Sequence, residues 1–300
     1  MKKLLALLAA TTALSGAAFA ESHGISEFNI GILGGENAQD RLASTECLRV
    51  KTEELLSVPV KLFTPADYDG VIQGLLGGTL DFAWLGASAY AKVYLNDPEA
   101  VDILLTKQNT DGTTGYYSIG FAKADSGINS MDDAKGRTFA FADPNSTSGF
   151  LVPAAELTAK YGKLEDYFSE VKMSGGHEQT IVGVANGDFE AGVSWADGLG
   201  NWEDGFTSGA FRKAADAGLV DMSTMKEIWR SALIPEGPMV VRRVLPQDVK
   251  DKMLAMLDTM WADDKECAYN VAAGEAQDFV PVTHDQYLGI IAARKLQEGM

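Results

Sequence analysis

The sequence contains few of the residues that metal centres and reactive thiols require. Its 300 residues include two cysteines, Cys47 and Cys267, and three histidines. No pair of these residues has the spacing of a zinc motif, and no glycine run fits the dinucleotide or Walker patterns. We therefore expect no metal and no cofactor. In an oxidising compartment two cysteines form one disulfide or remain buried thiols, and the sequence leaves both states open.

Positive charge is scarce as well. The chain has 25 Lys and Arg residues against 42 Asp and Glu residues, which gives a net charge of −17. Removal of an N-terminal leader that contains Lys2 and Lys3 would change the net charge to −19. Because binding to phosphate backbones depends on Lys and Arg, this balance excludes a general nucleic-acid binder. Any anion that the protein binds must be held by local dipoles against an unfavourable overall field.

Long apolar runs are also missing, apart from one near the N-terminus. Leu4–Leu14 is too short to span a membrane, and it is followed by the small-x-small pattern Ala18-Phe19-Ala20 before Glu21. We predict a cleavable signal peptide over residues 1–20 and an exported mature chain. Cysteine is absent near the cleavage point, so we expect no lipid anchor and no direct membrane insertion.

The rest of the chain alternates between strand-like and helix-like segments. The first part predicts, in order, strand 27–33, helix 39–56, strand 58–63, helix 67–76 and strand 80–85. This rhythm is typical of an α/β fold with a mainly parallel sheet. In such sheets, ligands bind beyond the carboxyl ends of the strands.

An internal similarity indicates two lobes. Gly78–Trp84 and Gly187–Val193 share the form Gly-x-apolar-acid-x-small-apolar, and each leads into a small polar loop. Two lobes of similar design would enclose a cleft. We expect the chain to cross between them near 113–121 and again near 234–241. The predicted first lobe comprises residues 21–114 and 239–300, and the second comprises residues 115–238.

One loop has more hydroxyl groups than its position requires. Ser146, Thr147 and Ser148 lie within 143–153, between a predicted strand at 138–142 and a helix at 154–160. Hydroxyls beside the free N–H groups of a helix N-terminus suit a tetrahedral oxyanion. Ordinary helix capping is the simpler interpretation. The loop alone does not decide between them.

His177 follows a glycine turn at another predicted helix start, where it is either solvent-exposed or a second oxyanion contact. Ser146, His177 and Asp197 also suggest a hydrolase triad. We disfavour a secreted hydrolase because no Ser lies in a Gly-x-Ser-x-Gly elbow. Tyr68 starts a predicted helix on the cleft side, and Trp195 is either core or a contact for a ligand's tail.

Together these segments resemble the periplasmic substrate-binding proteins of phosphonate ABC importers, over essentially the whole mature chain. Besides 143–153, the resemblance is carried by Asp67-Tyr68-x-Gly70-Val71-Ile72, Ala83-Trp84-x-Gly86, Gly115-Tyr116, Gly176-His177-Glu178, Val184-Ala185-Asn186 and Ile228-Trp229-x-Ser231. It implies a type II periplasmic-binding-protein fold, in which two α/β lobes joined by two crossing strands close over the ligand. It also implies a non-enzymatic receptor that delivers an organophosphonate to an inner-membrane ABC permease. A phosphite or phosphate receptor of the same fold is the alternative.

The resemblance also assigns residues to the two ends of a ligand. The residues implied to bind the phosphonate oxygens are Tyr68, Tyr116, Ser146, Thr147, Ser148 and His177. At the amine end it implies two acids, Asp197 and a second at position 237, where this chain has Gly237. Glu236 is a possible replacement, although a one-residue shift in an extended segment turns the side chain to the opposite face. Smaller or differently substituted phosphonates, and phosphite, are therefore candidates beside 2-aminoethylphosphonate.

Overall fold

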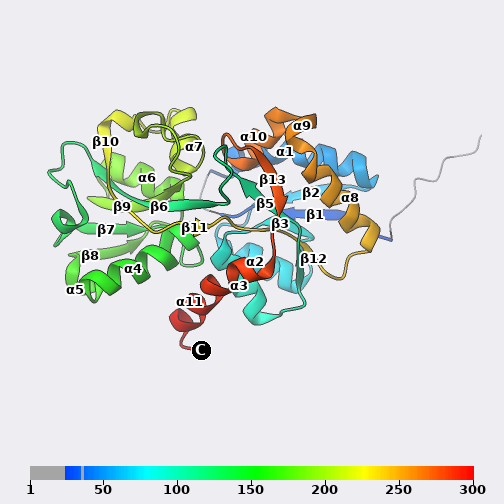
Figure 1. Ribbon diagram of the computed structural model, residues 1–300, viewed down its shortest axis with the longest axis horizontal. Coiled ribbons are helices and arrows are strands. Elements are labelled where there is room, and N and C mark those ends of the chain that lie inside the picture. Colours follow the sequence, from blue (N-terminus) through cyan, green and yellow to red (C-terminus); the bar gives the residue numbers. More distant parts are fainter. Residues whose placement is uncertain (1–23, 35–36) are drawn as a thin grey trace, which may run out of the picture.

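Two β-sheets, each covered by its own helices, divide the molecule into two lobes (Figure 1). The computed structural model describes residues 24–34 and 37–300. The predicted signal peptide and its cleavage point lie outside the described residues. None of the helices described has the length and apolar character needed to cross a bilayer.

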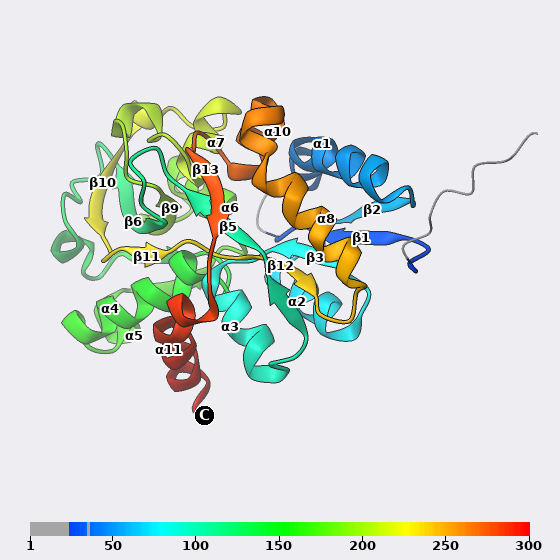
Figure 2. The same ribbon diagram turned by 45° about the vertical axis from the view of Figure 1, so that its right-hand side comes forward.

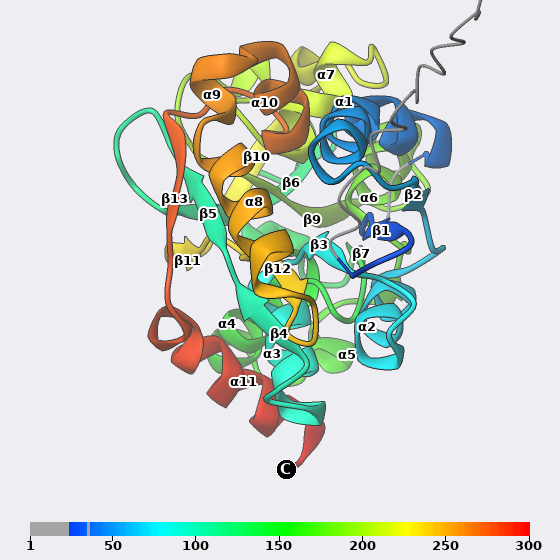
Figure 3. The same cartoon turned by 90° about the vertical axis from the view of Figure 1, so that its right-hand side faces the viewer.

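The first lobe is built on a five-stranded sheet with the order β2-β1-β3-β12-β4. Its strands are β1 (Phe28–Gly31), β2 (Val60–Phe63), β3 (Phe82–Trp84), β4 (Val101–Ile103) and β12 (Met239–Arg242). Its helices are α1 (Ala38–Leu56), α2 (Tyr68–Gly77), α3 (Ala87–Asn96), α8 (Gln247–Asp258), α9 (Met260–Asp263), α10 (Lys265–Ala272) and α11 (Leu288–Glu298). A separate antiparallel pair joins β5 (Leu105–Gln108) to β13 (Asp278–Pro281), and the two lie side by side in Figure 3.

The second lobe has strands in the order β10-β6-β9-β7-β8, and β11 also pairs with β6. These strands are β6 (Gly115–Lys123), β7 (Thr138–Phe141), β8 (Glu170–Met173), β9 (Ala191–Ala196), β10 (Met225–Arg230) and β11 (Ile234–Pro235). The helices are α4 (Val152–Tyr161), α5 (Leu164–Tyr167), α6 (His177–Asn186) and α7 (Ala210–Asp216). This division of the strands is consistent with the expected lobe boundaries. The boundaries themselves stay a prediction.

Both sheets are mixed, so the expectation of a mainly parallel sheet holds only in part: in each strand order, four of the five strands run in one direction and one runs against them. β1 pairs in parallel with β2 and β3, and β7 pairs in parallel with β8 and β9. In contrast, β12 is antiparallel to β3 and β4, and β6 is antiparallel to β9 and β10. The chain enters the second lobe along β6 and returns to the first along β12. These crossing strands therefore run against the strands that βαβ units supply.

The internal similarity corresponds to the same local structure in both lobes. Gly78 and Gly187 end helices α2 and α6 in the left-handed conformation, with φ of 77° and 87°. Glycine adopts this conformation at little cost, and it ends a helix by bonding the last carbonyls. The chain then enters β3 or β9, which lie inside their sheets. The loop after β3 reaches the other lobe, where Gly86 approaches the side chain of Thr147.

Residues from the C-terminal part of the chain pack into the first lobe. Val249, Met253 and Leu257 of α8 share a buried cluster with Phe28 and Ile30 of β1. α11 packs against α3 and extends toward α4 of the second lobe (Figure 2). The first lobe is therefore assembled from both ends of the described chain.

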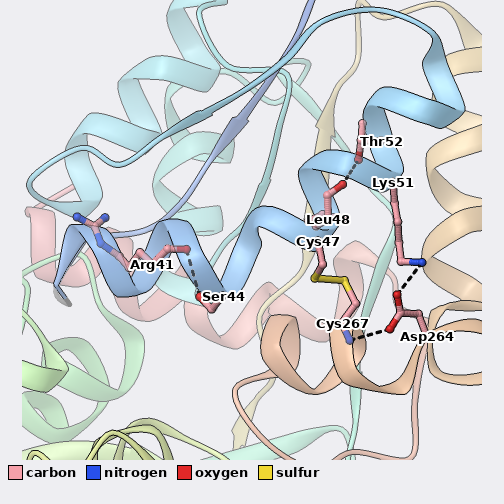
Figure 4. The surroundings of a disulfide bond; sticks show 8 residues. All are labelled: Arg41, Ser44, Cys47, Leu48, Lys51, Thr52, Asp264 and Cys267. Carbon is pink, nitrogen blue, oxygen red and sulfur yellow. Dashed lines mark hydrogen bonds and ion pairs between the residues drawn. A yellow bond between two sulfur atoms is a disulfide. The ribbon is translucent and has the colours of Figure 1, made fainter.

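Cys47 on α1 and Cys267 on α10 form a disulfide (Figure 4). Beside it, Lys51 and Asp264 form an ion pair at 2.8 Å. Oδ1 of Asp264 also accepts a hydrogen bond from the backbone N of Cys267, at 3.1 Å. The bond joins two helices of the first lobe that are 220 residues apart in the sequence.

Candidate anion-binding cleft

A cavity of about 210 Å³ lies between the two lobes. The first lobe contributes Leu33, Leu85 and Gly86 to its wall, and the second contributes Tyr116 and Trp195. All six residues predicted to bind phosphonate oxygens line this cavity: Tyr68, Tyr116, Ser146, Thr147, Ser148 and His177. The structure thus brings together side chains that come from four separate segments of the sequence.

Four helical segments begin at the cavity. α2 begins at Tyr68, α3 follows its N-cap Gly86, a π-helical turn leading into α4 begins at Thr147, and α6 begins at His177. Each of these residues lines the cavity. The first N–H groups of a helix lack partners within the helix and form the positive end of its dipole. Their convergence makes the cavity favourable for an anion in a protein of net charge −17.

Ser146 and His177 are in contact. Oγ of Ser146 accepts a hydrogen bond from the backbone N of Gly149 at 3.0 Å and lies 3.0 Å from Nε2 of His177. Nδ1 of His177 lies 3.3 Å from Oγ of Ser194. Because His177 is 6% exposed, its interpretation as a solvent-exposed helix residue is wrong. Ser146 does cap the π-helical turn, as the simpler interpretation proposed.

Tyr116 places its phenol beside the hydroxyls of the loop. Burial is the main cause that raises the pKa of Tyr116, and the charge of Glu236 raises it further. Hydrogen bonds with Ser148 and Thr147 act in the opposite direction. The raised pKa keeps the phenol protonated at neutral pH. Tyr116 is therefore available as a hydrogen-bond donor to an oxyanion without adding charge.

Residues 143–148, here called the anion loop, also contact the first lobe. Oδ2 of Asp143 accepts a hydrogen bond from the backbone N of Tyr68 at 3.2 Å. Oγ1 of Thr147 accepts one from the backbone N of Ser88 at 2.8 Å. Between them, Oδ1 of Asn145 accepts hydrogen bonds from Lys92 Nζ at 3.2 Å and Arg294 Nη2 at 2.5 Å. Alternate side chains of the anion loop thus reach across the cleft.

The two acids predicted for the substituent end are placed differently. Glu236 lines the cavity, whereas Asp197 is not one of the lining residues. Oδ1 of Asp197 accepts a hydrogen bond from Leu199 N at 3.2 Å, and Oδ2 accepts one from Thr207 Oγ1. Both oxygens of Asp197 therefore stabilise the loop that follows β9. The ligand-binding roles of both acids stay predictions.

Gly237 is held too close to the first lobe to carry a side chain. A Cβ added at this position would lie 1.9 Å from the carbonyl oxygen of Leu85. The carbonyl of Gly237 accepts hydrogen bonds from Trp84 Nε1 at 2.8 Å and Thr106 Oγ1 at 2.9 Å, which fix this approach. The missing acid at position 237 is thus matched by a backbone contact that a side chain could enter only by displacing the carbonyl of Leu85.

Sequence reasoning missed Lys107, whose side chain is fully buried. Its Nζ lies 3.6 Å from Oε2 of Glu236 and donates to Oγ of Ser208 at 2.9 Å. It also lies 5.3 Å from the ring centroid of Trp195. The available signal was a lysine within the apolar segment 103–107, but a lysine near a strand end is ordinarily exposed.

Arg41 is a second cavity-lining residue that the sequence did not indicate. Its Nη1 donates to the carbonyls of Leu33 at 3.0 Å and Pro65 at 3.2 Å, and so links the loops after β1 and β2. Within the described chain, no group of three or more His, Cys, Asp or Glu residues is arranged to hold a metal ion.

Residues 30–287 match the family described as ABC transporter, phosphonate, periplasmic substrate-binding protein. The chain belongs to this family. The membership confirms the resemblance seen in the motifs of the sequence.

Several known proteins are similar to this phosphonate-family binding protein. The phosphate-import protein PhnD of Mycolicibacterium smegmatis is 29% identical over 274 residues, which cover 85% of this chain and 81% of that protein. The phosphonates-binding periplasmic protein of Escherichia coli is 32% identical over 234 residues, covering 75% of this chain and 63% of that one. A binding protein of a phosphonate ABC transporter from Pseudomonas aeruginosa superposes with a TM-score of 0.78 and 26% identity, over 91% of this chain and 86% of that one. The predicted type II bilobal fold is confirmed.

Proposed function

We propose that this protein captures an organophosphonate between its lobes and delivers it to an inner-membrane ABC permease. The observation that carries the proposal is the convergence of six predicted head-group residues and four helix starts on one cavity. Of the three named relatives, two are described by phosphonate and one by phosphate, so a phosphorus oxyanion is the shared chemistry. The sequence further supports export by cleavage after residue 20.

In the proposed mechanism, the lobes close because each supplies part of the site. Tyr68 comes from the first lobe, whereas Ser148 and His177 come from the second. The hydrogen bonds of Asp143 and Thr147 to the first lobe form only when the lobes meet. Head-group binding and closure are therefore coupled through the anion loop. The closed form is the state that the permease would recognise.

We further propose that the protein performs no chemistry on its ligand. In the triad interpretation, His177 would need a carboxylate at Nδ1, but Nδ1 faces the hydroxyl of Ser194. The Oγ of Ser146 already accepts a hydrogen bond as a helix cap. Incubation with methylphosphonate and a phosphomonoester is expected to release no product beyond background. Turnover that is abolished by Ser146→Ala would contradict the receptor proposal.

Calorimetric titration with methylphosphonate and inorganic phosphate tests the ligand class. We expect saturable one-to-one binding of methylphosphonate and weaker binding of phosphate in competition. If phosphate binds as tightly as every phosphonate tested, the protein is a phosphate receptor and the assignment is wrong. Phosphite serves as the third competitor, because it has the same oxygens but no carbon substituent.

A further inference from the structure

A cation of the protein lies beside the cavity, behind the lining residues Glu236 and Trp195. Lys107 has a side chain with 0% exposure, and Glu236 beside it has 9%. Glu236 is the one acidic residue among the described residues that line the cavity. Its Oε2 is 3.6 Å from Nζ of Lys107 and accepts no hydrogen bond within the described part of the chain.

The aromatic face that would attract a ligand cation is engaged as well. Nζ of Lys107 lies 5.3 Å from the ring centroid of Trp195, within the range of a cation–π interaction. Edges of Trp195 contact Tyr116 and His177, with centroid distances of 5.5 Å and 6.4 Å. The indole ring is thus packed between the head-group residues and the lysine.

We propose that Lys107 occupies the place of a ligand ammonium group, so that this protein selects phosphonates with an uncharged substituent. The pair of Lys107 and Glu236 carries no net charge, and an added ammonium group would be repelled by Nζ of Lys107. A hydroxyl group would instead donate to Oε2 of Glu236, which has a hydrogen bond still to accept. The preferred class is therefore a short hydroxyalkyl phosphonate. Lys107 acts as a specificity-determining residue without touching the ligand.

The inference rests on the proposed function, and one set of titrations tests both. The ligands are 2-hydroxyethylphosphonate, methylphosphonate and 2-aminoethylphosphonate. For the unaltered protein we expect the hydroxyethyl compound to bind at least about tenfold more tightly than the aminoethyl compound. If none of the three binds, the proposed function fails. If all bind but the aminoethyl compound binds most tightly, only this inference fails.

Lys107→Met removes the ammonium and leaves Glu236 without a partner. The ratio of aminoethyl to hydroxyethyl affinity is expected to rise at least about tenfold, because the ligand then supplies the missing cation. Lys61→Met is the matched control, since Lys61 loses the same charge on the exposed side of β2, at 54% exposure. An unchanged ratio in Lys107→Met, or an equal change in Lys61→Met, overturns the inference.

Glu236→Gln provides a second test that does not depend on the folding of Lys107→Met. It leaves the ammonium of Lys107 uncompensated beside the cavity. Affinity for phosphonoacetate, whose carboxylate can pair with Lys107, is expected to rise at least about tenfold relative to that for the hydroxyethyl compound. Circular dichroism establishes that each variant is folded. A folded Glu236→Gln variant with unchanged preference shows that the pair does not set specificity.

Discussion

Individual side chains in the cleft differ in their expected roles: some are predicted to bind the ligand, some stabilise the contact between the lobes, and some do both. Thr147 was predicted to bind phosphonate oxygens, and its hydroxyl accepts a hydrogen bond from the opposite lobe. Ser148 faces Tyr116, and His177 lies between two hydroxyls. Substitution of Ser148 and His177 therefore reports on ligand binding more directly than substitution of Thr147.

Ser148→Ala and His177→Ala are each expected to weaken methylphosphonate binding by about 1 to 3 kcal/mol, the cost of losing a hydrogen bond to a charged group. Calorimetry gives the dissociation constants. Ser223→Ala is the control, because Ser223 is an exposed residue whose hydroxyl bonds Asp221. Unchanged dissociation constants in both test variants would remove these residues from the site.

The shifted pKa of Glu236 predicts that the stability of the protein depends on pH. Burial raises the pKa of Glu236 above its ordinary 4.5, and the Lys107 ammonium opposes this shift. The folded protein then holds the proton more tightly than the unfolded chain. Stability from this group is complete below the ordinary pKa and is lost as pH rises through the raised value. We expect the unfolding free energy of the unaltered protein, minus that of Glu236→Gln, to fall as the pH rises above the ordinary value of 4.5. A constant or rising difference in urea titrations contradicts the shift.

The residues of the cleft show where sequence reasoning succeeds. Ser146, Ser148 and His177 were predictable because each lies in a short motif whose local structure is a helix start. Lys107 was not, because its burial depends on β13 and Ser208, which come from remote parts of the chain. Both carboxylate oxygens of Asp197 accept hydrogen bonds within the loop after β9, and its ligand contact stays a prediction. Contacts between distant segments leave little trace in local sequence.

Among the structural elements, the segment between β11 and β12 is closely constrained by its neighbours. It returns the chain to the first lobe and passes directly over the end of β3 at Gly237. The hydroxyl of Tyr287 donates to the carbonyl of Glu236 at 3.0 Å, which adds a contact from the C-terminal segment. This crossing segment is therefore held in place by the backbone as well as by side chains.

Gly237→Ala is expected to lower the unfolding free energy by about 1 to 3 kcal/mol, because the new Cβ must displace the carbonyl of Leu85. Urea unfolding measures the effect. Gly289→Ala is the control, since a Cβ there meets nothing within 4 Å and the residue lies inside α11. That variant should gain about 0.5 to 1 kcal/mol from helix propensity. Equal effects of the two substitutions would show that the segment adjusts freely.

At the scale of the elements, the alternation of strands and helices could be predicted from the sequence. The pairing of the strands within the sheets could not. The predicted helix 39–56 corresponds to α1 (Ala38–Leu56), and strand 138–142 corresponds to β7 (Thr138–Phe141). The direction of β6 and β12 could not be predicted, because it depends on how often the chain crosses between lobes. Local periodicity contains no information on that path.

For the molecule as a whole, the first lobe is discontinuous and the second is continuous. Cys47 and Cys267 join the two parts of the first lobe covalently, with the second lobe between them in the sequence. A cross-link stabilises a fold mainly by restricting the unfolded chain, and more so for a long loop. The disulfide should therefore be a major contribution to the stability of the first lobe.

The double substitution Cys47→Ser with Cys267→Ser is expected to lower the unfolding free energy by about 2 to 5 kcal/mol. Urea unfolding is compared with and without a thiol reductant. The unaltered protein should lose stability in the reductant, whereas the double variant should not respond. A double variant as stable as the oxidised protein contradicts this role of the disulfide.

The position of β12 between β3 and β4 determines which of the two lobes can complete its sheet first. β3 and β4 lie on either side of β12, so the first sheet stays incomplete until residues 239–242 have been made. All strands of the second sheet lie earlier in the chain, within residues 115–235. The lobe that appears second in the sequence is thus the first that can finish folding. The N-terminal strands stay unpaired with β12 until residues 239–242 are available to the first lobe.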